Sequence, residues 1–144
     1  MLSRLCGVVL AGVLLSGCQS PSSGSGPRAE GALGPNTVVV EQGQNGETVT
    51  LKPGQTLLVR LPEEPARGMA WEMEQMPDAS VLMPDGTRVV RSGQQLQDNS
   101  LLAYQELRFQ AQTAGVTTLA LAYDNPQQGS DSITRRFTLK VSVK

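Results

Sequence analysis

Hydrophobic and polar residues alternate with a period of two in short stretches from about residue 36 to the end of the chain, which predicts β-strands. We expect the stretches "TVVVEQG" and "ETVTLKPGQ" to form the opening strands, with a turn at Pro53-Gly54 between them. In the next stretch, "TLLVRL", the residues Leu57, Val59 and Leu61 share one face. That face is predicted to point into a hydrophobic core.

The later stretches repeat this alternation. In "MAWEMEQM", Met69, Trp71 and Met73 share one side, and the turn signal "PDG" at residues 84–86 precedes the strand "TRVVRS". The remaining predicted strands are "QELRFQAQ", "GVTTLALAY" and "SITRRFTLKVSV". The inward residues expected in the first and the last of these are Leu107, Phe109, Ala111, Phe137, Leu139, Val141 and Val143. Helical spacing is convincing in no stretch, and "SGQQLQDNSLLAYQE" is the one ambiguous segment.

Short strands separated by turn signals over about 100 residues are typical of two antiparallel sheets packed face to face. The pattern therefore predicts an all-β fold, an immunoglobulin-like antiparallel β-sandwich. A small β-barrel is the main alternative. The Cys…Trp…Cys pattern of antibody domains is absent.

The N-terminal segment differs in composition from the rest of the chain. Residues 1–17 contain one early cation, Arg4, followed by the apolar run "LCGVVLAGVLL", which is the layout of a secretory signal peptide. The tetrad "LSGC", ending at Cys18, resembles the lipobox of bacterial lipoproteins. This resemblance implies cleavage before Cys18 and lipidation of that cysteine, which anchors the protein to a membrane. An ordinary secretory signal with an incidental Cys18 is the alternative.

This interpretation divides the chain into three segments. Residues 1–17 are the signal peptide, residues 18–35 are a flexible tether rich in Ser, Gly and Pro, and residues 36–144 are one folded domain. The mature domain has no pair of cysteines for a disulfide, since Cys6 leaves with the signal and Cys18 carries lipid. The residue after the cysteine is Gln19 and not the aspartate that resembles an inner-membrane retention signal. We therefore expect a cell-envelope location, in the outer membrane facing the periplasm if the cell is Gram-negative.

Charge and residue types narrow the function. The chain has 12 Lys and Arg, 13 Asp and Glu, and a formal net charge of −1, with no basic stripe, so we expect no nucleic-acid partner. The absence of histidine removes the commonest general base and the commonest metal ligand. Ser-His-Asp, Cys-His and His-zinc sites are therefore excluded. We expect a protein that is not an enzyme and binds no cofactor.

The order of motifs from about residue 46 onward resembles the chagasin family of cysteine-peptidase inhibitors. The residues that support this resemblance are "GQTLLVRLPEEPARGMAW", "LRFQAQTAGVTTLALAY", "NP" and "RRFTLKVSV". It implies an immunoglobulin-like sandwich that blocks papain-like cysteine peptidases with three loops at one end. The partner would be such a peptidase or, if the fold serves as a non-inhibitory interaction module, another envelope or secreted protein.

The resemblance also assigns the three loops. The first reads Asn-Pro-Thr-Thr-Gly-Tyr in the family, followed by one residue and Trp, and here only its proline, glycine and tryptophan are kept. The family's second loop is rich in glycine, which is absent here, and the aromatic residue of its third loop, Arg-Pro-Trp, is replaced by glutamine. The corresponding peptidase-binding residues are Glu64, Pro65, Ala66, Arg67, Gly68 and Met69, then Ser100, Leu101, Leu102 and Ala103, then Asp124, Asn125, Pro126 and Gln127.

Two further features have their own interpretations. Trp71 is expected to be a structural core residue, as a tryptophan on an inner strand of such a sandwich usually is. The methionines near Trp71 are soft ligands suited to Cu(I), so a copper-carrying lipoprotein is a more distant alternative. The methionines concerned are Met69, Met73, Met76 and Met83. Filling of the core by Met69 and Met73 is the simpler explanation.

Overall fold

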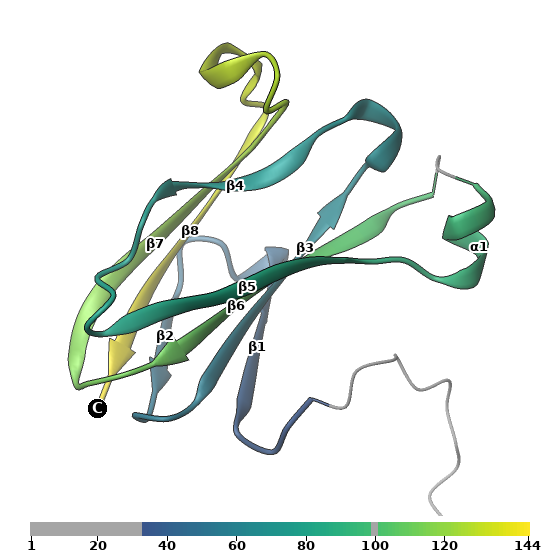
Figure 1. Cartoon of the computed structure of the whole chain (residues 1–144). Coiled ribbons are helices and arrows are strands. Elements are labelled where there is room, and N and C mark those ends of the chain that lie inside the picture. The colour runs from purple at the N-terminus through teal and green to yellow at the C-terminus, as the bar shows by residue number, and fades with distance from the viewer. Residues whose placement is uncertain (1–32, 99–100) are drawn as a thin grey trace, which may run out of the picture. The chain divides into compact units, whose positions relative to one another are not determined.

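A computed structural model describes residues 33–98 and 101–144 of the chain, which fold into two sheets packed face to face (Figure 1). The strands are β1 (Thr37–Glu41), β2 (Thr48–Leu51), β3 (Thr56–Glu63), β4 (Ala70–Gln75), β5 (Leu82–Val90), β6 (Ala103–Ala111), β7 (Gly115–Asp124) and β8 (Arg135–Val143). Short helical turns lie between them: η1 (Gln42–Gln44), η2 (Pro65–Arg67), α1 (Gly93–Gln97) and η3 (Gly129–Ser132). The predicted signal peptide and most of the predicted tether lie outside the described residues.

The two sheets have four strands each. The first has the order β1-β3-β6-β5 and the second the order β2-β8-β7-β4. Neighbouring strands are antiparallel except β1 beside β3 and β2 beside β8, which are parallel. The chain thus crosses from one sheet to the other between its first two strands. The sandwich predicted from the sequence is confirmed.

The core lies between the two sheets and contains the inward residues of the alternating stretches. Leu57, Val59 and Leu61 of β3 are fully buried, as are the aromatic rings of β6 and β8, Phe109 and Phe137. Every second residue of a strand points to the same side, so the period-two pattern identified this face correctly. Met69 and Met73 pack against the edge of this core.

Neither of the two turn signals in the sequence forms the connection that was expected of it. The prediction that Pro53-Gly54 separates the first two strands is wrong, because this turn joins β2 to β3, with Gly54 at a φ of +87°. β1 and β2 are joined by η1 and a turn at Gly46, which has a φ of +83°. A positive φ costs glycine nothing, and for this reason both turns use it.

The "PDG" signal at residues 84–86 is a bulge inside β5, so the expectation of a turn before a separate strand is also wrong. The pairing register of β5 with β6 shifts between Pro84 and Thr87, and Gly86 has a φ of +104°. A bulge inserts extra residues into one strand without ending it. The same residues therefore produce a bulge where the neighbouring strand continues to pair on both sides of them.

The ambiguous segment after β5 contains the short helix α1. Ser92 caps its first turn: its hydroxyl accepts a hydrogen bond from the Gln95 amide at 3.2 Å, and the Gln95 side chain bonds back to the Ser92 amide. Five residues are too few to show a helical hydrophobic stripe, which explains why the pattern was unclear. None of the helices among the described residues is long and apolar enough to cross a membrane.

The outer face of the first sheet contains a buried acid. Glu106 of β6 points away from the core, as the alternation predicts, yet it is 0% exposed. Arg60 of β3 and Arg88 of β5 pair with it in register and cover it, with nitrogen–oxygen distances of 2.6 Å and 2.7 Å. Burial by itself raises the pKa of Glu106, but the hydrogen bonds and charges of the two arginines outweigh it and lower that pKa.

Candidate functional site

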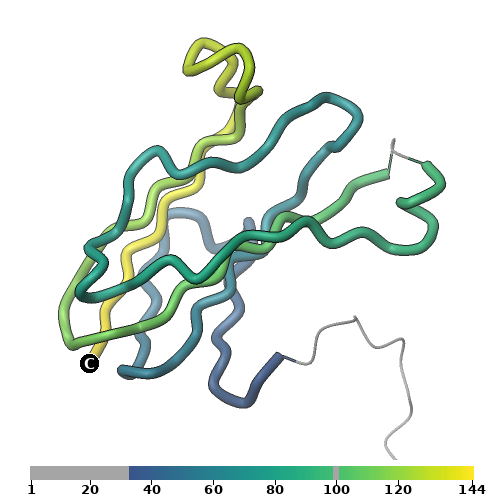
Figure 2. Tube along the Cα trace, in the orientation of Figure 1, coloured from purple at the N-terminus to yellow at the C-terminus, as the bar shows by residue number. Residues whose placement is uncertain are grey.

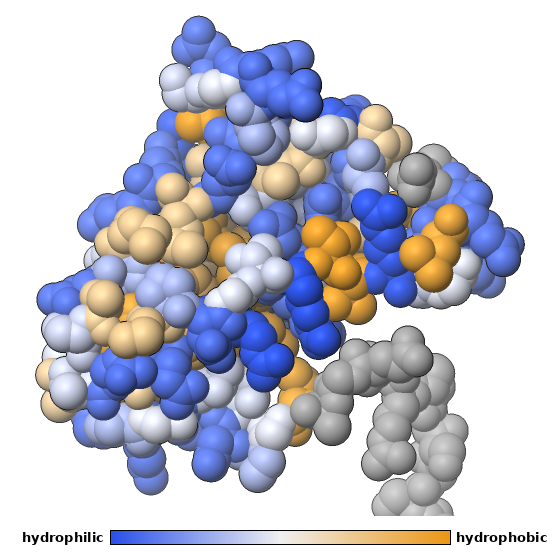
Figure 3. Space-filling model, viewed as in Figure 1, coloured by the Kyte–Doolittle hydropathy of each residue, from blue (hydrophilic) through white to orange (hydrophobic). Residues whose placement is uncertain are grey.

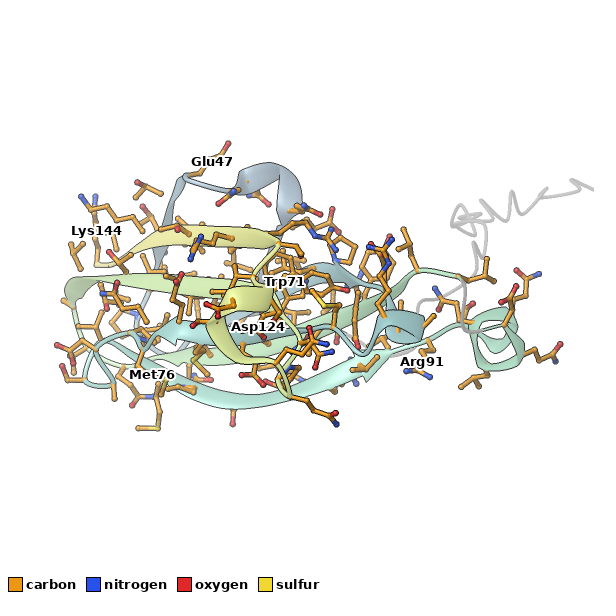
Figure 4. All side chains as sticks on the ribbon, turned by 90° about the horizontal axis from the view of Figure 1, so that it is seen from above. Glu47, Trp71, Met76, Arg91, Asp124 and Lys144 are labelled. Atoms are coloured by element: carbon orange, nitrogen blue, oxygen red, sulfur yellow. The ribbon has the colours of Figure 1, made fainter. Side chains whose placement is uncertain are left out.

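Three connections between strands lie at one end of the sandwich. The end of β3 pairs with the start of β6 (Glu63 with Ala103), and the start of β4 pairs with the end of β7 (Ala70 with Asp124). This register brings together the first loop (residues 64–69), the described parts of the second loop (residues 91–98 and 101–102) and the third loop (residues 125–134). In both views η2 of the first loop lies between α1 and η3 of the other two loops (Figure 1, Figure 4).

The first loop is a tight turn. Pro65 begins the helical turn η2, where its fixed φ suits the conformation, and Gly68 ends it in the left-handed region with a φ of +63°. The Gly68 amide bonds to the Pro65 carbonyl at 3.2 Å, and the Arg67 amide bonds to the Glu64 carbonyl at 3.1 Å. The side chain of Arg67 is 72% exposed. The loop therefore presents a cation on a stiff backbone.

Glu64 contacts residues of its own loop and of the second sheet. Its amide donates to the Tyr123 hydroxyl at 2.7 Å, and its carboxylate contacts Arg67 at 3.0 Å and Arg135 at 3.5 Å. Tyr123 and Arg135 belong to the second sheet, so these contacts join the first loop to β7 and β8. The sequence predicted Glu64 as a binding residue, and in the structure it holds the base of the loop.

Trp71 lies between the sheets and is 2% exposed (Figure 4). Its indole N–H donates to the Pro62 carbonyl at 2.9 Å. Its backbone amide and carbonyl bond to the side chain of Gln105 at 2.7 Å and 2.6 Å, so a residue of β6 satisfies the free edge of β4 across the core. Sequence reasoning missed Gln105, whose signal was a polar side chain at an inward position beside Leu107.

The second loop exposes leucines. Leu101 is 40% and Leu102 is 51% exposed, whereas Ser100 lies outside the described residues. Ala103 is fully buried at the start of β6. Its side chain therefore points into the core, and of the described residues in this predicted set only the leucines before it are exposed. Figure 3 shows hydrophobic residues, interrupted by hydrophilic ones, towards the side that carries α1, where Leu96 is 72% exposed.

The third loop is held by its own polar groups. The Asn125 side chain accepts a hydrogen bond from the Gln127 amide at 3.0 Å, and the Asn125 amide donates to the Ser132 hydroxyl at 2.9 Å. Pro126 and Gln127 are exposed. Asp124 ends β7, with one buried carboxylate oxygen that has no hydrogen-bond partner. The predicted residues of this loop thus divide into exposed Pro126 and Gln127 and residues that shape the loop.

A second acid lies buried near the same end. Glu63, the last residue of β3, is 7% exposed, and one of its carboxylate oxygens has no hydrogen-bond partner. Burial raises the pKa of Glu63, and the charge of Arg91 opposes this rise only in part. Figure 4 shows Arg91 on the side of the molecule that carries α1. Burial beneath the loops therefore favours the neutral form of the Glu63 carboxyl.

The structure separates the methionines proposed as copper ligands. Met69 and Met73 pack against the core, whereas Met76 is 61% and Met83 is 47% exposed. Met83 pairs with Gln110 on the outer face of the first sheet. The four thioethers therefore do not converge on one ion. In residues 33–98 and 101–144, no group of three or more Asp, Glu, Cys or His side chains is placed to hold a metal.

Comparison with known proteins gives one family and several similar structures. Residues 50–141 match the family model described as "Chagasin family peptidase inhibitor I42". A search of curated protein sequences gives no match. The cysteine protease inhibitor EhICP2 from Entamoeba histolytica has a similar structure, with a TM-score of 0.65 and 16% identity over 75% of this chain and 96% of its own.

Two further structures share the fold. Amebosin gives a TM-score of 0.63 at 21% identity, covering 77% of this chain and 100% of its own. PbICP-C, solved in complex with falcipain-2, gives 0.56 at 10% identity, covering 76% and 99% of the two chains. At these identities the likeness shows a common fold.

Proposed function

Because this chain belongs to the chagasin family of peptidase inhibitors, we propose that it inhibits papain-like cysteine peptidases through the three loops at one end of its sandwich. Members of the family are inhibitors and not enzymes. The observation that carries the proposal is the register of the strands, which gathers the three predicted loops at the same end. The similar structures add support, since EhICP2 is described as a cysteine protease inhibitor and PbICP-C was solved bound to falcipain-2.

The first loop supports a wedge that enters a cleft. Pro65 and Gly68 fix a narrow turn, and a stiff turn loses little entropy when it binds. Arg67 at its tip presents a guanidinium that can pair with a carboxylate or stack on an aromatic ring of the peptidase. Since Gln127 supplies no aromatic anchor in the third loop, we infer that Arg67 makes the largest single contribution to binding.

Titration of papain with the soluble domain tests this proposal, with residual activity measured on a small fluorogenic peptide. The protein is the chain from residue 18 onward carrying Cys18→Ser. Inhibition that saturates at one inhibitor per peptidase, with the inhibitor recovered uncleaved, is the expected result. Unchanged activity at inhibitor concentrations up to about 100 μM, corresponding to less than about 5.5 kcal/mol of binding free energy, would contradict it.

Arg67→Ala should weaken inhibition by about 2 kcal/mol or more, which is the cost typical of a hot-spot residue. Its ion pair with Glu64 is largely exposed, at 72% and 34%, so the free energy of unfolding should change by less than about 0.5 kcal/mol. Lys52→Ala, in the exposed turn at the other end of the sandwich, is the matched control. Equal inhibition constants for the two variants would exclude Arg67 as the main contact.

A non-inhibitory interaction module on the same fold is the second candidate function. It is favoured by the open groove of about 340 Å³ that lies beside the second loop, where Leu102 and Tyr104 meet Arg60 and Pro62. Leu102 and Tyr104 are 51% and 43% exposed. If papain and related peptidases are not inhibited, an envelope or secreted partner would dock through the same loops, with this groove as an adjoining contact surface.

We further propose that Cys18 is lipidated and that the protein is anchored in the cell envelope and, if the cell is Gram-negative, in the outer membrane facing the periplasm. The support is the "LSGC" tetrad at the end of an apolar run, followed by Gln19. Residues 18–35 then act as the tether between the membrane and the sandwich. Fractionation of cells, described below, tests this proposal.

A further inference from the structure

We propose that Arg135 and Tyr123, which lie outside the three predicted sets of contact residues, are positioning residues that hold the first loop in its inhibitory conformation. The proposal rests on the proposed inhibitory function. It assigns Glu64 to the same cluster, as the residue through which the two act. We call Glu64, Tyr123 and Arg135 the loop anchor.

Arg135 is held firmly against the core. Its guanidinium carbon lies 4.2 Å from the centre of the Tyr123 ring and 5.7 Å from the centre of the Trp71 ring. The two rings are themselves packed, with centroids 5.0 Å apart and planes inclined by 40°. Both rings are 2% exposed, so they are fixed by the sandwich. A cation stacked on fixed rings has a restricted set of orientations.

The first residue of the loop is bound to this fixed group in two ways. The Tyr123 hydroxyl accepts a hydrogen bond from the Glu64 amide at 2.7 Å, which fixes the backbone. Arg135 contacts one oxygen of the Glu64 carboxylate at 3.5 Å, which fixes the side chain. The other oxygen contacts Arg67 at 3.0 Å, so the chain of contacts extends from the core to the exposed cation of the loop.

This arrangement bears on binding because it restricts the first loop in the free protein. The residues at the tip, Ala66 to Gly68, are exposed, so the core does not hold them directly. A loop that is free to move must lose that freedom when it enters a cleft, and each side chain that is immobilised weakens the affinity. An anchor that already restricts the loop in the free protein removes part of that loss.

The neighbouring residue Arg136 provides a matched control. It pairs with Glu74 at 3.1 Å on the outer face of the second sheet, and its side chain is 60% exposed. Since adjacent residues of a strand point to opposite faces, its side chain does not reach the loop anchor. Arg136→Ala therefore removes the same charge from the same strand and leaves the first loop untouched.

The test compares the inhibition constant for papain of Arg135→Ala, Tyr123→Phe and Arg136→Ala, each in the chain from residue 18 onward with Cys18→Ser. Arg135→Ala should raise the inhibition constant by about tenfold or more and Tyr123→Phe by about threefold, while Arg136→Ala should leave it unchanged. Should Arg135→Ala fail to fold, Tyr123→Phe still tests whether the loop anchor affects inhibition, because it removes only one hydroxyl. Equal inhibition constants for all three variants would overturn the proposal.

Two further measurements separate positioning from a general loss of stability. In a double-mutant cycle, Glu64→Gln and Arg135→Ala should not be additive, because each breaks the same contact. Amide hydrogen exchange should show faster exchange of Glu64 and Gly68 in Arg135→Ala than in Arg136→Ala, at a temperature where both variants are folded. Additive effects, or unchanged exchange, would contradict the inference.

These results also distinguish the proposal from the function on which it rests. If the wild-type chain fails to inhibit papain, the proposed function fails, and the exchange measurement still decides whether Arg135 holds the loop. If the wild type inhibits papain and Arg135→Ala inhibits it equally well, only the positioning role fails.

Discussion

Glu63 and Glu106 are both buried glutamates, yet their environments shift their pKa values in opposite directions. Burial dominates at Glu63, which has an oxygen without a hydrogen-bond partner, so its pKa is raised. At Glu106 two arginines outweigh the effect of burial, so its pKa is lowered. At these two glutamates, the direction of the pKa shift therefore depends on whether the hydrogen bonds and charges of nearby arginines outweigh the effect of burial.

Glu106→Gln should lower the free energy of unfolding by about 1.5–3 kcal/mol, because it removes the buried charge that accepts hydrogen bonds from Arg60 and Arg88, whose side chains are themselves partly exposed. Chemical denaturation at pH 7 measures this. The control is Glu74→Gln, whose pair with Arg136 is exposed and should contribute less than about 1 kcal/mol. Similar losses for the two variants would show that the Glu106 cluster behaves as a surface ion pair.

The same group predicts a dependence of stability on pH. A lowered pKa in the folded state means that Glu106 contributes stability above its unfolded pKa and loses it as the pH falls through the folded value. Glu63, with its raised pKa, contributes in the opposite sense: its contribution is complete below its unfolded pKa and is lost as the pH rises through the folded value. Between pH 7 and pH 3, the free energy of unfolding should therefore fall more steeply with decreasing pH in the wild type than in Glu106→Gln.

Trp71→Ala should destabilise the domain by about 3–5 kcal/mol, the usual cost of removing a large buried aromatic side chain. The residue is 2% exposed, supports the Tyr123 ring and donates to the Pro62 carbonyl. Trp71→Phe keeps most of the ring and should cost clearly less than Trp71→Ala. Thermal or denaturant unfolding measures both, and a loss below about 1 kcal/mol for Trp71→Ala would place the indole outside the core.

Among the elements, the first loop owes the shape of its turn to the left-handed backbone conformation of Gly68. Gly68→Ala places a side chain at a φ of +63° and should cost about 1 kcal/mol of stability, with a larger relative loss of papain inhibition. Gly43→Ala in η1, where an added Cβ meets nothing within 4 Å and no positive φ is involved, is the control. Full inhibition by Gly68→Ala would show that the shape of the turn is not needed for binding.

On the scale of the whole molecule, the loops and the point of entry of the chain lie at opposite ends. β1 starts beside the start of β3, and the C-terminal residues of β8 pair with β2, whereas the first loop follows the end of β3 (Figure 2). β3 spans about 26 Å, at about 3.3 Å per residue. An anchor at Cys18 would thus hold the sandwich by the end that carries no binding loop.

Cys18→Ser should move the protein from the membrane fraction to the soluble fraction, or leave it uncut, because a serine cannot accept the lipid through a thioether. Immunoblots of separated membrane and soluble fractions measure this, with the wild type as the reference. The soluble form should inhibit papain as well as an anchored form would, since the described part of the chain begins at the end of the sandwich opposite to the first loop. Equal partitioning of the two forms would contradict lipid anchoring at Cys18.

The sequence by itself determined the fold class and the inward face of most strands, because side chains alternate along a strand regardless of its neighbours. It also located the stiff first loop, since Pro65 and Gly68 restrict the backbone locally. The structures that the two turn signals form could not be derived in this way. Whether Pro-Gly or Pro-Asp-Gly ends a strand or makes a bulge depends on what the neighbouring strand pairs with.

Only the tertiary structure decided the roles of the polar residues. The Gln105 side chain meets the Trp71 backbone 34 positions away, Arg60 meets Glu106 across 46 positions, and the Tyr123 hydroxyl meets the Glu64 amide across 59. The alternation identifies the face on which such a residue lies, but the identity of its partner depends on strand order and register. These properties arise when the whole core packs, and for this reason the loop anchor was not predicted from the sequence.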